Sequence, residues 1–213
     1  SMSWEHVYCM TAEELMDIEC PKRAEYLRVI ALEMQRTASH LMWLGALAPD
    51  LGNLTMFLYP LRERELLLDL FQQLSGARMT YNYCRIGGVA NDMPENFDRD
   101  LLKALDWIDK KMIDYEGMFD ESRAFLMRMQ DVGKVSAAAA MNLGMTGPNL
   151  RGSGAEIDIR KMDRYSVYDE LDWRVMTEKD GDCYARYRVR INEMRESSNI
   201  IRDALKKMPA GPV

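Results

Sequence analysis

The chain has few residues that could bind a metal, and its cysteines are far apart in the sequence. The histidines are His6 and His40, and the cysteines are Cys9, Cys20, Cys84 and Cys183. Metal sites within one chain, and redox-active dithiols, need such ligands at short spacing, as in a Cys-X-X-Cys pair. The sequence therefore predicts no bound metal, and it predicts reduced thiols in a cytosolic compartment.

An excess of positive charge is also absent, because 28 Lys and Arg stand against 34 Asp and Glu, giving a net charge of −6. Nucleic-acid binding requires a basic face, so we expect no nucleic-acid partner. No apolar run approaches the roughly 20 residues that cross a bilayer, and we expect neither a transmembrane segment nor a signal peptide. Apolar residues form 47% of the 213 residues, which is enough for one sizeable core.

Apolar residues recur at the three- and four-residue spacing that is typical of helices. This spacing predicts long helices over residues 4–18, 22–48, 57–74, 98–129 and 182–208, and a short alanine-rich helix over 136–143 that we place in the interior. Two glycine-containing irregular segments, 76–95 and 144–172, interrupt them. The expected fold class is mainly α, with two long glycine-rich loops and little strand. Residues 4–213 form a single helical domain in this interpretation, and residues 1–3 are a tag remnant.

The stretch from Leu32 to Glu65 combines an apolar run with isolated polar groups. Residues 41–48 are apolar on every side, which predicts a helix buried all round, and Pro49 should end it. Asp50 lies at that break. It either caps the next helix or is a carboxylate whose apolar setting raises its pKa, so that it exchanges protons. His40 is either a satisfied core residue or a group that transfers protons.

Charged and glycine-rich motifs admit two interpretations each. The block 62–65, Arg-Glu-Arg-Glu, is either a solvated helix face or an interior ion network. Arg78 and Arg85 precede Gly87–Gly88, and the segment 151–154 reads Arg-Gly-Ser-Gly. These arginines either pin their own loops to carbonyl groups, or they set the electrostatics of a partner's redox centre while the glycines let the backbone approach it closely.

Four segments, taken in order, resemble the quinone-site subunit of respiratory complex I, the 49-kDa-type or D-type subunit, including its archaeal coenzyme F420H2 dehydrogenase relatives. They are SGARMTYNYCRIGGV, TGPNLRGSGAEIDIRK, YSVYD at 165–169 and GDCYARYRVRINEMRES. The resemblance covers about residues 4–211. It implies a helical core like that of the hydrogenase large subunit, without metal, in the peripheral arm on the cytoplasmic face of the membrane.

The resemblance also implies a quinone chamber formed with the subunit that holds the terminal 4Fe–4S cluster, with electron transfer coupled to proton pumping. Asp50 matches the family's acid that pairs with a quinone-ligating histidine, and it would act as a proton relay. The residues that match the family's two loops are Arg78, Arg85, Gly87, Gly88, Arg151, Gly152, Ser153 and Gly154. Thr80 stands where many members carry a histidine beside the cluster, so we expect no titrating group there.

The quinone-ligating histidine and tyrosine of the family belong upstream of residue 4, and its C-terminal tail belongs beyond residue 213. We therefore expect the central portion of a longer subunit, which is inactive alone and binds no cofactor itself. The implied partners are the iron–sulfur (B-type), C-type and membrane (H-type) subunits, quinone as substrate, and NADH or F420H2 as donor to the whole complex. Methionine-rich apolar patches could also pair two isolated chains.

Two other hypotheses stay open from the sequence. One is the large subunit of a membrane-bound, energy-converting nickel–iron hydrogenase, which differs by Cys-X-X-Cys pairs near both ends of the full protein. The other is a helical scaffold without chemistry, whose loops only bind protein.

Overall fold

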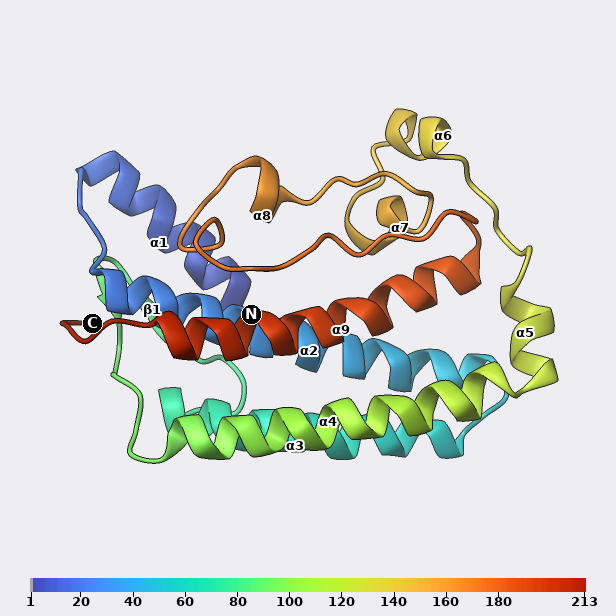
Figure 1. Cartoon of the computed structure of the whole chain (residues 1–213), viewed down its shortest axis with the longest axis horizontal. Coiled ribbons are helices and arrows are strands. Elements are labelled where there is room, and N and C mark those ends of the chain that lie inside the picture. Colours follow the sequence, from blue (N-terminus) through green and yellow to red (C-terminus); the bar gives the residue numbers. More distant parts are fainter. Residues whose placement is uncertain (1) are drawn as a thin grey trace.

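The computed structural model describes residues 2–213 and contains a bundle of four long helices that run alternately in opposite directions (Figure 1). These helices are α2 (Lys22–Asp50), α3 (Thr55–Ser75), α4 (Phe97–Asp120) and α9 (Cys183–Lys207). Each contacts the next, and α9 packs back onto α2, so that the bundle closes on itself. Leu27, Leu67, Leu105 and Ile201 are among the buried side chains that fill it.

The remaining elements cover the ends and one side of the bundle. The helix α1 (Met2–Met16) packs on α2 and on a small hairpin made of β1 (Cys84–Arg85) and β2 (Gly88–Val89). Four short helices lie between α4 and α9: α5 (Arg123–Met129), α6 (Ala137–Asn142), α7 (Gly147–Arg151) and α8 (Ile159–Met162). The prediction of a mainly α fold with little strand is confirmed. Within residues 2–213, no helix has the length and hydropathy of a membrane span.

Two predicted helix ends were wrong. The helix α2 continues through Pro49, because a proline in the last turn costs only the bond to the Gly45 carbonyl, while the amide of Leu51 still reaches the carbonyls of Leu47 and Ala48. The segment predicted as one helix over 98–129 is two helices. Ser122 interrupts it, since its side chain accepts a hydrogen bond from the Phe125 amide and begins α5.

The interior placement of the alanine-rich helix was also wrong. Of the residues in α6, only Ala140 is buried. Alanine favours helix formation wherever the helix lies, so the run reflects helix propensity and not burial. At the N-terminus, Met2 and Ser3 belong to the first turn of α1 and Met2 is buried. Ser1 lies outside the described residues, and the origin of residues 1–3 stays a prediction.

Candidate functional site

The first glycine-rich loop forms an exposed two-residue turn. Cys84 pairs with Val89 and Arg85 with Gly88, so that Ile86 and Gly87 make the turn between the strands. Gly87 has a φ of +87°, which L side chains rarely adopt, and this explains the glycine at that position. The side chains of Arg85 and Ile86 are exposed. The turn therefore presents a cation and an apolar group outward.

The backbone of this turn is held by a buried ion pair, which we call the Glu13–Arg28 clamp. Arg28, fully buried near the start of α2, donates through Nη2 to the carbonyl of Arg85 at 2.7 Å and to that of Gly88 at 2.9 Å. Glu13, from α1, accepts from Arg28 Nη1 at 3.0 Å and from the amide of Gly87 at 2.7 Å. Burial by itself would raise the pKa of Glu13, but these hydrogen bonds outweigh it and lower the pKa.

A second carboxylate from α1 fixes the segment before the turn. Glu5 accepts from the amides of Asn82 at 3.0 Å and Tyr83 at 2.9 Å. Asn82 and Thr80 both have positive φ, at 48° and 54°. The hairpin is thus anchored through its backbone, while the Thr80 and Arg85 side chains remain exposed.

The charge block of α3 divides between two environments. Glu63 is fully buried and accepts from Trp107 Nε1 at 3.1 Å, from Arg62 Nη2 at 2.7 Å and from the Tyr115 hydroxyl. Glu65 is exposed and, with Asp69, pairs with Arg78. The block is therefore part interior network and part solvated face. The charge of Arg78 is compensated by carboxylates of its own chain.

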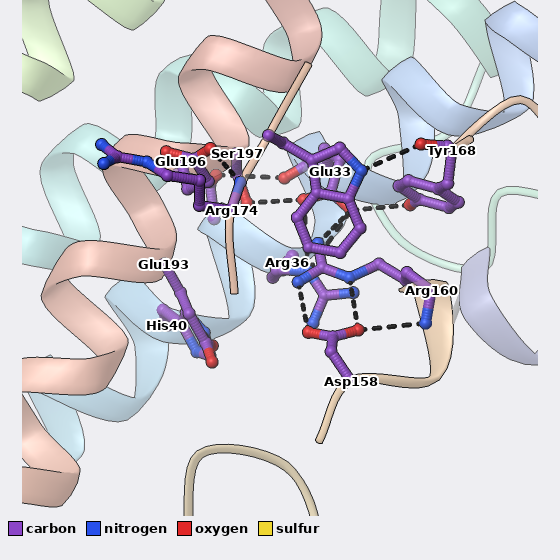
Figure 2. A network of polar contacts seen from close by, with 12 residues as sticks. Glu33, Arg36, His40, Asp158, Arg160, Tyr168, Arg174, Glu193, Glu196 and Ser197 are labelled. Atoms are coloured by element: carbon purple, nitrogen blue, oxygen red, sulfur yellow. Dashed lines mark hydrogen bonds and ion pairs between the residues drawn. The ribbon is translucent and has the colours of Figure 1, made fainter. Parts of the chain in front are cut away.

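A buried network connects α2 to the second glycine-rich segment (Figure 2). Glu33 is fully buried in α2 and accepts from Arg160 Nη1 at 2.9 Å, the Tyr168 hydroxyl at 2.6 Å and Ser197 Oγ at 2.6 Å. Burial would raise the pKa of Glu33, but Arg36 and Arg160 outweigh it, together with these hydroxyl hydrogen bonds, and lower the pKa to about 2. The carboxylate is therefore ionised and serves as the anionic centre of the network.

A second buried carboxylate, Glu193 of α9, draws Arg151 inward. It accepts from Arg151 Nη2 at 2.6 Å and contacts His40 Nε2 at 2.7 Å. Burial lowers the pKa of His40 and outweighs the opposing effect of Glu193. His40 is thus a buried side chain that is paired with Glu193, and its role in proton transfer stays a prediction.

The Arg151–Gly154 segment does not present its arginine to a partner. Arg151, Gly152 and Ser153 are buried, and only Gly154 is exposed. A Cβ added at Gly152 would lie 2.9 Å from Cγ of Arg186, so the glycine permits close packing on α9. Inside this chain, Glu193 and the carbonyl of Ile157 accept the hydrogen bonds of Arg151, and a role toward a redox partner stays a prediction.

Asp50 is exposed at the end of α2, and neither interpretation from the sequence fits its surroundings. It does not cap α3, because the amide of Met56 bonds to Asn53 Oδ1 instead, at 3.3 Å. No apolar wall encloses it within residues 2–213. The prediction that α2 is buried all round over 41–48 was also wrong.

One face of α2 stays exposed over about three turns. It consists of Ser39, Met42, Ala46 and Asp50, which we call the α2 stripe. Their three- and four-residue spacing places them in a row on one side of the helix. Met42 is 46% exposed although it is large and apolar. The row of small and apolar side chains thus ends at a carboxylate.

The structure does not bring the predicted residues together into one site. Arg28 holds the hairpin near the first turn of α2, and Asp50 is its last residue (Figure 1). Over 22 residues, a rise of 1.5 Å per residue separates them by about 33 Å. His40 and its partner Glu193 lie between, about 15 Å along the helix from Asp50.

Sequence reasoning missed the residues that hold these loops. They are Glu13, Arg28, Glu33, Asp158, Arg160 and Glu193. The available signal was a charged residue at a position that helical spacing assigns to the core, as Glu33 between Leu32 and Met34. Such a position predicts a buried ion pair, because an isolated buried charge is too costly.

Comparison with known proteins adds the family. The family described as "Respiratory-chain NADH dehydrogenase, 49 Kd subunit" matches residues 50–213. The chain is 49% identical over 212 residues to the H subunit of the chloroplastic NAD(P)H-quinone oxidoreductase of Chlorokybus atmophyticus, covering 100% of this chain and 54% of that protein. It is 44% identical over 205 residues to the D 2 subunit of the NADH-quinone oxidoreductase of Rhizobium etli (strain CIAT 652), covering 96% of this chain and 51% of that protein.

The chain thus spans about half the length of these curated relatives. The family match over 50–213 includes the hairpin, the Arg151–Gly154 segment and α9, and the two relatives extend the similarity over α1 and α2 as well. The chain belongs to the 49 Kd subunit family of the respiratory-chain NADH dehydrogenase.

Proposed function

We propose that this chain forms part of the quinone-reducing site of a proton-pumping NADH- or F420H2-dependent oxidoreductase. The observation that carries the proposal is the α2 stripe, an exposed row of small and apolar side chains that ends at Asp50. Met42 in this row is large, apolar and 46% exposed, and we take the row as a surface that another molecule covers. The relatives' names, which specify quinone oxidoreductases, give the class of that molecule.

The chemistry of the stripe suits a quinone. Reduction to the quinol takes up two electrons and two protons, and the protons bind the two carbonyl oxygens. Asp50 would deliver one of these protons, directly or through a neighbouring group, while Met42 and Ala46 would contact the apolar part of the molecule. Other parts of the assembly would complete the chamber and exclude water from it.

The electrons would arrive from a 4Fe–4S cluster in a B-type partner that docks on the hairpin. The exposed Arg85 side chain offers that partner a positive charge, and the exposed Ile86 beside it offers an apolar contact. Gly88, which was predicted from the sequence to share this contact, is buried against Val213 of this chain. Because the hairpin and Asp50 lie about 33 Å apart along α2, the partner would have to extend along this helix and carry its cluster close to the bound quinone. C-type and H-type subunits would place the assembly at the cytoplasmic face of the membrane.

The test is Asp50→Asn in the complex purified from cells that carry the substitution. We expect quinone reduction to fall by about tenfold to a thousandfold, because general acid catalysis contributes about 10² to 10⁴ and other groups can substitute in part. Reduction of an artificial acceptor by the electron donor should be unchanged. Asp98→Asn is the matched control, since Asp98 is exposed in the first turn of α4.

The outcomes separate the hypotheses. Unchanged quinone reduction in the Asp50→Asn complex would contradict the role of Asp50. Hydrogen-dependent reduction by the purified complex would favour the hydrogenase alternative instead. We also expect this chain alone to reduce no quinone, because the proposed chamber needs other parts of the assembly, and measurable activity would refute that expectation.

A further inference from the structure

The helix α1 has two rows of side chains on opposite faces. One row, at three- and four-residue spacing, is buried against α2 and the hairpin and consists of Met2, His6, Cys9 and Glu13. The other row follows the same spacing and is exposed, and we call it the α1 stripe: Trp4, Tyr8, Thr11 and Leu15. At 3.6 residues per turn, the centres of the two rows lie nearly half a turn apart. The α1 stripe therefore faces away from the bundle.

The α1 stripe is aromatic and apolar over its length of about 17 Å. Trp4 is 76% exposed and Leu15 is 81% exposed. The Thr11 hydroxyl donates to the carbonyl of Val7 at 2.8 Å, so a covering surface need not supply a partner for it. A surface helix normally has one apolar face, directed at the core. Because tryptophan and tyrosine are enriched where protein chains meet and contribute much of the binding energy there, the second face of α1 has the composition of an interface between chains.

The charge around the α1 stripe has one sign. Residues 2–21 contain five acidic side chains and no lysine or arginine. Glu14, Asp17 and Glu19 are exposed at the C-terminal end of α1, where the helix dipole disfavours negative charge, and no ion pair within residues 2–213 includes them. They lie, with the exposed Ile18, among the residues that line a hollow of about 460 Å³. A cationic side chain in this hollow would offset the unfavourable charges.

We propose that the α1 stripe is the docking surface for a basic amphipathic helix of another polypeptide chain. Aliphatic side chains of that helix pack between Trp4 and Leu15, as ridges pack into grooves between helices. Its lysine or arginine side chains lie beside Glu14 and Asp17. The proposal does not rest on the proposed function, because it uses only the shape and charge of α1.

The same charges disfavour two other occupants. A second copy of this chain would bring two acidic α1 helices together, and α1 has no lysine or arginine to pair with the added carboxylates. An anionic membrane surface would be repelled for the same reason. A helix with positive charge beside an apolar row complements both the apolar and the acidic parts of this surface.

The first experiment measures the binding of two synthetic helical peptides to this chain by isothermal titration calorimetry. Both peptides carry the same leucine row, which is flanked by lysine in one and by glutamate in the other. We expect the lysine peptide to bind at least about tenfold more tightly, and Leu15→Asp to weaken its binding by about tenfold or more. Ile113→Asp is the matched control, because Ile113 is 65% exposed on α4 and the variant adds the same charge without changing α1. Circular dichroism checks that both variants are folded.

The second experiment identifies the occupant in cells that produce the protein. A photoreactive benzophenone amino acid replaces Tyr8, or Ile113 in the control, and the cross-linked peptide is sequenced by mass spectrometry. We expect the Tyr8 position to cross-link to a segment of another chain that has aliphatic residues at three- and four-residue spacing beside lysine or arginine. The Ile113 position should not cross-link to this segment.

Several results would overturn the proposal. In the first experiment they are equal binding of the two peptides, unchanged binding by Leu15→Asp, and an equal loss in Ile113→Asp. In the second they are a cross-link within the same polypeptide, to a second copy or to lipid, and the absence of any cross-link at the Tyr8 position. Because neither experiment measures quinone reduction, such a failure would leave the proposed function unaffected.

Discussion

The Arg85–Gly88 turn and the Arg151–Gly154 segment have similar sequences and opposite orientations. Both place two glycines within three residues after an arginine. In the first, the arginine side chain is exposed and its carbonyl is held from below by Arg28. In the second, the arginine side chain is buried and held by Glu193. The Arg85 side chain therefore points to solvent, whereas the Arg151 side chain stabilises the core.

The difference originates outside the loops. Glu193 lies 42 residues beyond Arg151, on α9, which packs against α2, and it supplies the anion that a buried guanidinium requires. Arg85 has no carboxylate partner among residues 2–213. A motif of arginine and glycines therefore does not determine its own direction. The arginine turns inward where a buried carboxylate is available to it, and beneath the Arg85–Gly88 turn Glu13 is already paired with Arg28.

The largest expected effect comes from removing that carboxylate. Glu193→Ala leaves His40 buried without its partner. Arg151 then keeps a single carboxylate partner within residues 2–213, Asp158 at 3.4 Å. We therefore expect the free energy of unfolding to fall by about 3 kcal/mol. Arg85→Ala, in the exposed turn, should change it by less than about 0.5 kcal/mol. Urea unfolding followed by circular dichroism measures both.

Glu156→Ala is the control for this pair, because Glu156 is an exposed glutamate in the same region as Arg151. If Glu193→Ala prevents folding altogether, Glu193→Gln keeps the shape and part of the hydrogen bonding, and should show a smaller loss. A change for Arg85→Ala as large as for the Glu193 variants would contradict the contrast between the two loops.

The buried network around Glu33 should also make the free energy of unfolding depend on pH. The pKa of Glu33 falls from 4.5 to about 2, a difference that corresponds to roughly 3 kcal/mol. Because the unfolded chain takes up this proton first as the pH falls, the stabilisation is complete above pH 4.5 and is lost as the pH falls toward 2. The difference in unfolding free energy between wild type and Glu33→Gln should therefore shrink between pH 5 and pH 3. A difference that stays constant would refute this assignment.

The glycines of the two loops should respond in opposite ways to the same substitutions. Gly87 has positive φ, which asparagine tolerates better than alanine does. Gly152 is confined by Arg186, so a larger side chain is worse. We expect Ala to cost more than Asn at Gly87 and less than Asn at Gly152, with losses of about 1–3 kcal/mol. Thermal unfolding of the four variants checks the order, and the same order at both positions would contradict the explanation.

The sequence predicted the four bundle helices because their apolar spacing extends over many turns, and packing then follows the same pattern. The sequence did not predict the features that depend on single hydrogen bonds or on contacts between residues far apart in the chain. Pro49 stayed in its helix, and Ser122 began a new one, through local hydrogen bonds. The exposure of Asp50 and Met42 was not predictable either. An apolar helix face has the same sequence pattern whether it packs against residues of this chain or against another chain.

The candidate site was predictable only as a set of loop residues. Gly87 could be placed in a tight turn from the two adjacent glycines, but the Glu13–Arg28 clamp joins residues 15 positions apart to a loop 60 positions further on. No local pattern encodes such a contact. The buried carboxylates appear in the sequence as charged residues at core positions. Because each of them needs a cationic partner, a search for that partner could have predicted that the Arg151 side chain points inward.

The smallest expected effect concerns Thr80, beside the exposed turn. Its φ of +54° is unfavourable for a β-branched residue and is tolerated better by histidine. Thr80→His should therefore leave the free energy of unfolding unchanged or raise it by up to about 1 kcal/mol, whereas Thr80→Val, which keeps the branch and loses the hydroxyl contact to the Met79 carbonyl, should lower it slightly. Because the side chain is exposed, the new imidazole should titrate near its ordinary pKa in nuclear magnetic resonance spectra. A strongly destabilised Thr80→His variant would mean that the segment before the exposed turn is as closely packed as the Arg151–Gly154 segment, and the contrast between the two loops would then fail.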